Sequence, residues 1–99
     1  MNYVEPIRQA LKRRIPDYEE WGERRDDLLD LYALLVLVWG DDTTPEHVHD
    51  AWSLHTSRTN PEHPSIIPFD DLAEEVQDYD RPYVLAIREV AAQLGQERG

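Results

Sequence analysis

The stretch that decides the fold is residues 28–39, LLDLYALLVLVW, the most hydrophobic run in the chain. Its second half is apolar on every face of a helix, and such a helix has to be surrounded by protein. Twelve residues interrupted by Asp30 are too few to cross a bilayer, so the run predicts a buried core helix. We expect this helix to begin near Glu23 and to end at Trp39, with Gly40 as its C-terminal stop.

Two arrangements would cover this helix. Either other helices of the same chain wrap it, or residues 31–39 form an interface with a second copy of the chain. The neighbouring segments offer enough apolar faces for wrapping, which we favour. A homodimer through residues 31–39 is the alternative.

The helix after the hydrophobic run has two possible start signals. Thr44 as N-cap places Pro45 at the first helical position, whereas Thr43 as N-cap would pair with Glu46 in a capping box. The chain cannot use both registers. We prefer Thr44, because proline is well suited to the first turn, and expect a helix over residues 45–56.

Helical patterns extend to both ends of the chain. Residues 4–15 carry apolar side chains at three- and four-residue spacing. Near the other end, Asp70 or Asp71 is expected to cap a short helix, and Asp80 to cap the last helix, which ends at Gly95.

A proline-rich loop separates these helices between residues 56 and 68. Its prolines at positions 61, 64 and 68 forbid a helix, although residues 65–67 could form a short extended segment. The sequence therefore predicts an all-α domain of four or five helices with a proline-rich loop, spanning residues 1–99 as one domain.

Composition and charge exclude several classes of function. The 99 residues carry 10 Lys and Arg against 21 Asp and Glu, a net charge of −11. So acidic a surface disfavours direct contact with nucleic acid or anionic membranes. The absence of cysteine excludes disulfides, thiolate zinc sites and thiol nucleophiles. The first residues lack the pattern of a signal peptide, so we expect a cytoplasmic protein.

The sequence offers little support for catalysis, a metal or a cofactor. All four histidines lie between positions 47 and 63, but their spacing does not match a helical zinc pair, which needs three or four residues. Nucleophile-elbow and phosphate-loop motifs do not occur, and the paired carboxylates mostly mark helix starts. We therefore expect a protein that is not an enzyme and has no metal or cofactor.

Several short motifs follow one another in the second half of the chain. His49-Asp50-Ala51-Trp52 precedes HPSIIPFDDL at residues 63–72, and Arg81-Pro82-Tyr83 and Ala86-Ile87 follow. This order and spacing resemble the ryanodine-receptor repeat (RyR) domain over about residues 45–94. One departure is that residues 53–62 are shorter than the corresponding family segment.

The resemblance implies a small, mostly helical binding module of actinobacterial or actinophage type. Residues 43–95 would form the repeat-like half, after an N-terminal helical hairpin over residues 1–42. The implied ligand is a nucleotide-derived small molecule or a protein partner. The residues it points to are His49, Trp52, His63, Pro68, Phe69 and Tyr83, and Arg58 and Arg81 are the nearby cations for a phosphate.

The same residues also have a structural interpretation. Trp52 would pack the loop onto the third helix, His49 would hydrogen-bond the loop backbone, and Phe69 would anchor the end of the loop. The alternative function is a protein-interaction or regulatory role without a small ligand. In that case the chain would act as a homodimer, or as an acidic DNA mimic that uses the −12 charge of residues 26–99.

Overall fold

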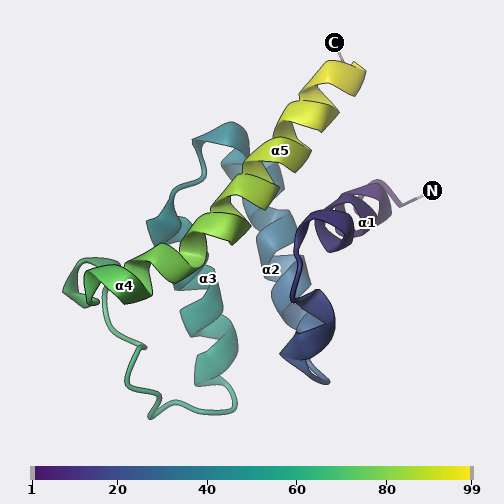
Figure 1. Ribbon diagram of the computed structural model, residues 1–99. Coiled ribbons are helices and arrows are strands. Elements are labelled where there is room, and N and C mark those ends of the chain that lie inside the picture. Colours follow the sequence, from purple (N-terminus) through teal and green to yellow (C-terminus); the bar gives the residue numbers. More distant parts are fainter. Residues whose placement is uncertain (1, 99) are drawn as a thin grey trace.

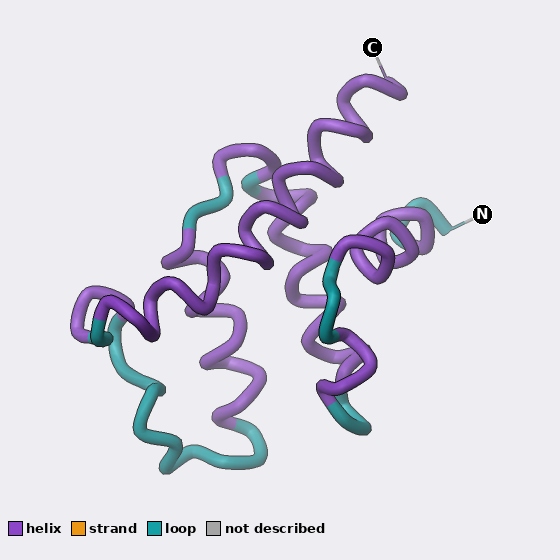
Figure 2. Tube along the Cα trace, viewed as in Figure 1, coloured by secondary structure: helices purple, strands orange, loops and turns teal. Residues whose placement is uncertain are grey.

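Helices account for most of the computed structural model, which describes residues 2–98 (Figure 1). The α-helices are α1 (Glu5–Arg14), α2 (Arg25–Val38), α3 (Pro45–Ser57), the single-turn α4 (Glu74–Gln77) and α5 (Arg81–Arg98). Short 3-10 turns lie at Tyr18–Trp21, Gly40–Asp42, Phe69–Asp71 and Asp78–Asp80. The described residues contain no strand, so the all-α prediction is confirmed, and residues 65–67 are loop (Figure 2).

Helix α2 lies at the centre, packed against α1, α3 and α5. Its buried side is formed by Leu28, Leu29, Tyr32, Ala33 and Val36. The other helices cover only this side, because Leu34, Leu37, Val38 and Trp39 remain exposed. Wrapping by the same chain is therefore incomplete. None of the helices in the described part of the chain is both long enough and apolar enough to cross a membrane.

The chain turns between α2 and α3 as the local sequence predicts. Gly40 follows α2 in the left-handed region, with φ of +58°, where a residue without Cβ is favoured. Thr44 is the N-cap of α3, and its hydroxyl accepts from the His47 N–H at 3.3 Å. The His47 ring accepts from the Thr44 N–H at 3.0 Å, so His47 completes the capping box. Thr43 is buried instead, and its hydroxyl donates to the Gly40 carbonyl.

The prediction that Asp70 or Asp71 caps a helix is wrong. Both residues lie in a 3-10 turn, and the backbone then becomes extended at Leu72, whose side chain is buried. Helix α4 begins only at Glu74. The Gln77 side-chain amide donates to two backbone carbonyls, that of Phe69 at 3.0 Å and that of Leu72 at 3.2 Å. Burial of Leu72 thus overrides the local capping signal.

Two expectations about α5 are also wrong. Asp80 belongs to a 3-10 turn that leads from α4 straight into α5, so the chain presents no separate helix start there for it to cap. Gly95 does not end α5, which continues to Arg98. Nothing packs within 4 Å of where a Gly95 side chain would begin, so no tertiary contact turns the chain at that point.

Candidate functional site

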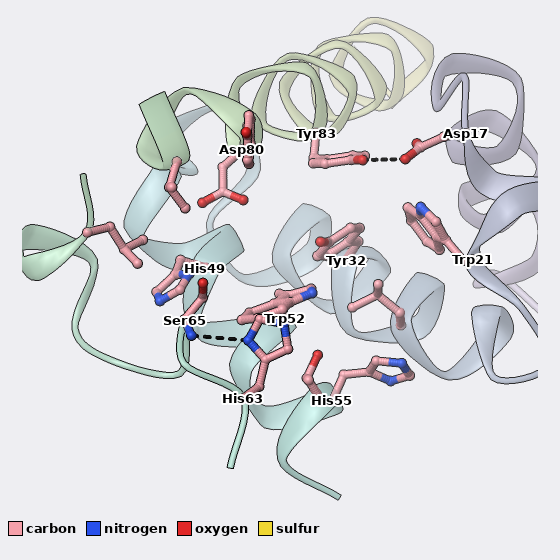
Figure 3. Close-up of a pocket in the computed structure, with 15 residues that line it drawn as sticks. Asp17, Trp21, Tyr32, His49, Trp52, His55, His63, Ser65, Asp80 and Tyr83 are labelled. Atoms are coloured by element: carbon pink, nitrogen blue, oxygen red, sulfur yellow. Dashed lines mark hydrogen bonds between the residues drawn. The ribbon is translucent and has the colours of Figure 1, made fainter. Parts of the chain in front are cut away.

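A cavity of about 630 Å³ opens between the proline-rich loop and the helices (Figure 3). Its walls come from the connector after α1, the first half of α2, the inner side of α3, the loop, and the segment from α4 into α5. The volume lies within the range of small-molecule sites. Most of the lining side chains are aromatic or apolar, which is also typical of such sites.

Three aromatic rings form one wall of the cavity. Trp21 meets Tyr32 edge-on, with ring centroids 5.7 Å apart and planes at 87°. It meets Tyr83 at 5.9 Å and 63°, and the two tyrosines lie 5.9 Å apart. These rings come from three segments: the connector after α1, then α2 and α5. Edge-to-face packing holds them in place and leaves polarised ring surfaces along the cavity.

A second wall holds the proline-rich loop against α3. The His49 ring stacks on Trp52 at 5.7 Å, and the Trp52 ring meets His63 edge-on at 5.0 Å. His49 Nε2 lies 2.7 Å from the Ile67 carbonyl. A carbonyl only accepts, so Nε2 carries the proton. In the loop itself, the Ser65 N–H donates to His63 Nδ1 at 3.1 Å. His49 therefore binds the loop backbone, as the structural interpretation expected.

Asp17 places a carboxylate at the edge of this cavity. Its Oδ2 accepts from the Tyr83 hydroxyl at 2.6 Å, across 66 positions of sequence. Its Oδ1 is buried and has no hydrogen-bond partner among the described residues. Burial, together with the Asp17 carboxylate, raises the pKa of Tyr83, so the phenol stays protonated and keeps donating. A buried acceptor without a donor is unfavourable, and Asp17 thus leaves one acceptor to be satisfied.

Asp80 is the second carboxylate at the cavity. It is half-buried, and burial raises its pKa to about 6, while the nearby His49 acts in the opposite direction. Burial also raises the pKa of Tyr32, and the charges of Asp80 and Asp17 add to this effect. Burial and the charge of Arg24 lower the pKa of His55. No Lys or Arg lines the cavity, which therefore has an acidic character.

Replacing Asp80 with asparagine is expected to stabilise the fold above about pH 6. The pKa of Asp80 is raised from 3.8 to about 6, so the folded protein loses stability as pH rises through that range and the carboxylate ionises. Because the group is only half-buried, solvent reduces the gain to on the order of 1 kcal/mol. Urea unfolding of both proteins between about pH 4 and pH 8 measures it.

The pH profile separates this effect from the general acidity of the chain. The gap between Asp80→Asn and the parent should be small near pH 4, should grow as the pH rises to about 6, and should stay constant above that pH. Asp50→Asn removes an exposed carboxylate from α3 and serves as the control for the loss of one negative charge. A gap that stays constant with pH would contradict a buried, ionising Asp80.

Four of the residues expected from the sequence line this cavity: His49, Trp52, His63 and Tyr83. The other four lie outside it. Pro68 is exposed, as is Arg58 at the end of α3. Arg81 is exposed and pairs with Asp78 at 3.4 Å, and it lines a separate hollow of about 390 Å³ that also contains Phe69.

Sequence reasoning missed Asp17, Trp21, Tyr32 and Asp80. Asp80 was taken for a helix cap and Tyr32 for part of an apolar core run, and nothing local distinguishes these roles. One feature of the sequence could have pointed to this part of the cavity. The short polar connector contains two aromatic residues, Tyr18 and Trp21, and bulky rings in a polar loop need a packing partner.

The histidines serve separate contacts. His47 stacks on Trp39 at 4.2 Å and caps α3, on a different part of the surface from the cavity. Within residues 2–98, no three His, Asp or Glu side chains gather as metal ligands would. The arrangement at the cavity suits enclosure of an organic molecule that donates hydrogen bonds to carboxylates.

The resemblance to the ryanodine-receptor repeat is wrong. A different family model matches the chain, and its match runs from residue 2, through the N-terminal helices that the resemblance left out. The quoted motif residues also have local structural causes here, such as the His49 contact with the loop backbone. Neither the curated proteins nor the solved structures include a match to this chain. The chain belongs to the family described as Domain of unknown function (DUF7701), whose model matches residues 2–92.

Proposed function

We propose that this protein is a non-enzymatic binding module that holds a small organic molecule in the cavity between the proline-rich loop and helices α2, α3 and α5. The supporting geometry is a volume of about 630 Å³ with two aromatic walls and two carboxylates. A space of this size, with few polar groups converging on it, suits a metabolite-sized ligand.

The observation that carries this proposal is the unpartnered Oδ1 of Asp17. The oxygen is buried, and its sister atom is already satisfied by Tyr83. Burying an acceptor without a donor costs about 1–3 kcal/mol in a folded protein. A ligand N–H or O–H placed against Oδ1 would recover that energy on binding. The site is therefore incomplete without a donor.

The histidines support a binding role over a catalytic one. His49 Nε2 donates to the Ile67 carbonyl, and His63 Nδ1 accepts from the Ser65 N–H. Both contacts hold the loop in place. We propose that they position a wall of the site and do not transfer protons.

The cytoplasmic location expected from the sequence stays a prediction.

The charge of the walls narrows the choice of ligand. A phosphate group would meet the carboxylates of Asp17 and Asp80 and no lining Lys or Arg. Arg58 and Arg81, the cations considered for a phosphate, lie outside the cavity. A ligand without phosphates fits better than a nucleotide. An uncharged nucleoside remains compatible with the aromatic walls.

A thermal-shift screen tests the binding role. The full chain is heated with adenosine, AMP, ATP and a set of indole and phenyl compounds of differing charge. A ligand at 100 times its Kd adds about 2.7 kcal/mol, a rise of several degrees in Tm for a domain of this size. Val76→Phe, which narrows the cavity from α4, should abolish the shift, and Leu85→Phe on the exposed side of α5 should keep it. A flat screen, or equal shifts in both variants, would refute the proposal.

A second role, in protein association, is favoured by one observation. Leu34, Leu37, Val38 and Trp39 are exposed together at the C-terminal half of α2. Contiguous apolar surface on a small protein often marks an interface. It is the same face for which the sequence suggested a homodimer, and its partner here is proposed to be a second copy.

Sedimentation analysis checks this second role. We expect a dimer that forms as the concentration rises. Leu37→Lys should weaken it, because the change places a charge in the exposed strip, which is formed by Leu34, Leu37, Val38 and Trp39. Leu54→Lys is the matched control, because Leu54 is also an exposed leucine but lies on α3. A monomer at every concentration, or equal effects of the two variants, would remove this role.

A further inference from the structure

The aromatic cluster already attracts cations at its outer edge. The rings of Tyr18 and Trp21 pack edge to face, with their centroids 5.7 Å apart. Two cations lie over the Tyr18 ring: Lys12 Nζ is 5.3 Å from the ring centroid, and Arg25 Cζ is 5.2 Å from it. A cation within about 6 Å of a ring face is attracted by the ring quadrupole. The chain thus supplies its own cations to the buried ring that packs against Trp21.

The inner rings of the same cluster have no such partner. Trp21, Tyr32 and Tyr83 line the cavity, and no ammonium or guanidinium from the described residues lies over them. The cavity therefore exposes aromatic rings like that of Tyr18, but no side-chain cation of the described residues covers them.

Two carboxylates also line the cavity: Asp17 lies beside Trp21 and Tyr83, and Asp80 lies on the other side of Tyr83 (Figure 3). Asp17 has its buried Oδ1 free of any described donor. Asp80 forms no hydrogen bond or ion pair with the described part of the chain, although most other half-buried charges have partners. Among the described residues, the walls of the cavity combine two carboxylates with aromatic rings and include no Lys or Arg.

We propose that the ligand is a small organic cation, an amine with a flat apolar body that packs beside the rings of Trp21 and Tyr83, and that the negative charges of Asp17 and Asp80 attract its nitrogen into the cavity. This inference rests on the proposed binding function and names its ligand class. A protonated amine supplies the donor that Asp17 Oδ1 lacks. The apolar body packs on the ring surfaces, which strengthens the attraction between cation and rings in a partly desolvated site.

Binding of an amine should weaken as the solution becomes acidic. The pKa of Asp80 is about 6, so below that pH one of the two negative charges is lost. The groups that face Asp80 are His49 from α3, Tyr32 from α2 and Tyr83 from α5. The two tyrosines stay neutral over this range because their pKa values are raised.

The test uses three indole compounds that differ in charge. Tryptamine is a cation, tryptophol is neutral, and indole-3-propionate is an anion, while the ring is the same. The chain has three tryptophans, and in a ¹⁵N-labelled protein each indole N–H should give its own signal. Trp21 and Trp52 line the cavity and Trp39 lies on the exposed strip of α2, so Trp39 is an internal control.

Titration of the full chain should move the Trp21 and Trp52 signals with tryptamine and leave Trp39 in place. We expect tryptamine to bind about 10-fold more tightly than tryptophol, a difference of about 1.4 kcal/mol, and indole-3-propionate to bind most weakly. Asp80→Asn should reduce the preference for the cation to near equality while the protein stays folded. Asp50→Asn removes the same charge from an exposed position and should retain the preference.

The outcomes separate this inference from the binding function. Tighter or equal binding of tryptophol or indole-3-propionate at Trp21 and Trp52 would overturn the cationic ligand and leave the binding module standing. Equal loss of preference in Asp80→Asn and Asp50→Asn would show that the attraction comes from overall charge, which also overturns it. If none of the three compounds moves Trp21 or Trp52, both the ligand class and the proposed function are wrong.

Discussion

Replacing Ile87 with alanine is expected to lower the free energy of unfolding by about 2–5 kcal/mol. Ile87 lies on α5 and has an exposed fraction of 0%, within the cluster of buried side chains that joins α5 to α2. Alanine leaves a cavity that the surrounding helices only partly fill. Because about 1 kcal/mol shifts Tm by roughly 4–8 °C at this size, the Tm should fall by ten degrees or more.

The matched control for Ile87 is two positions away on the same helix. Leu85 is 50% exposed, so Leu85→Ala should change the free energy of unfolding by less than about 0.5 kcal/mol. Urea unfolding followed by circular dichroism measures both variants. Similar losses in the two variants would mean that α5 does not bury the side described here.

Replacing His49 with alanine is the second large expected effect. The change removes the hydrogen bond to the Ile67 carbonyl and the ring contacts with Trp52 and Phe69. We expect a decrease of about 1–3 kcal/mol in the free energy of unfolding.

The loss of His49 should be felt most in the proline-rich loop. Without this contact, amide hydrogen exchange in residues 58–67 should speed up more than in α1 and α2, because the loop opens while the helical core persists. Asp50→Ala, at the exposed neighbouring position on α3, is the control and should leave loop exchange unchanged. Uniform acceleration across the chain would show that His49 supports the whole fold and not the loop in particular.

The helices near the middle of the chain could be predicted because their signals are local. Gly40 adopts the left-handed conformation that ends α2, and Thr44 caps α3 through its own hydroxyl. Each of these contacts joins residues a few positions apart, so a short stretch of sequence contains all the atoms involved. The start of α4 was mispredicted for the opposite reason, since burial of Leu72 depends on distant parts of the chain.

The cavity shows the same division. His49, Trp52, His63 and Tyr83 were named from the sequence, and they do line it. The family to which their spacing was attributed was wrong, because the same motifs serve the loop contact in this fold. A motif can therefore point to side chains that line a cavity even where the family it suggests is wrong.

The sequence by itself determined that this protein is all-α, that α2 ends before Gly40 and α3 begins after Thr44, and that His49 contacts the loop backbone. Only the tertiary structure decided that Asp17 meets Tyr83 across 66 positions and that Asp80 faces a cavity and caps no helix. The physical reason is that a cavity is the space left between helices after they pack. Its shape depends on how α2, α3 and α5 approach one another, and no local pattern of residues encodes that approach.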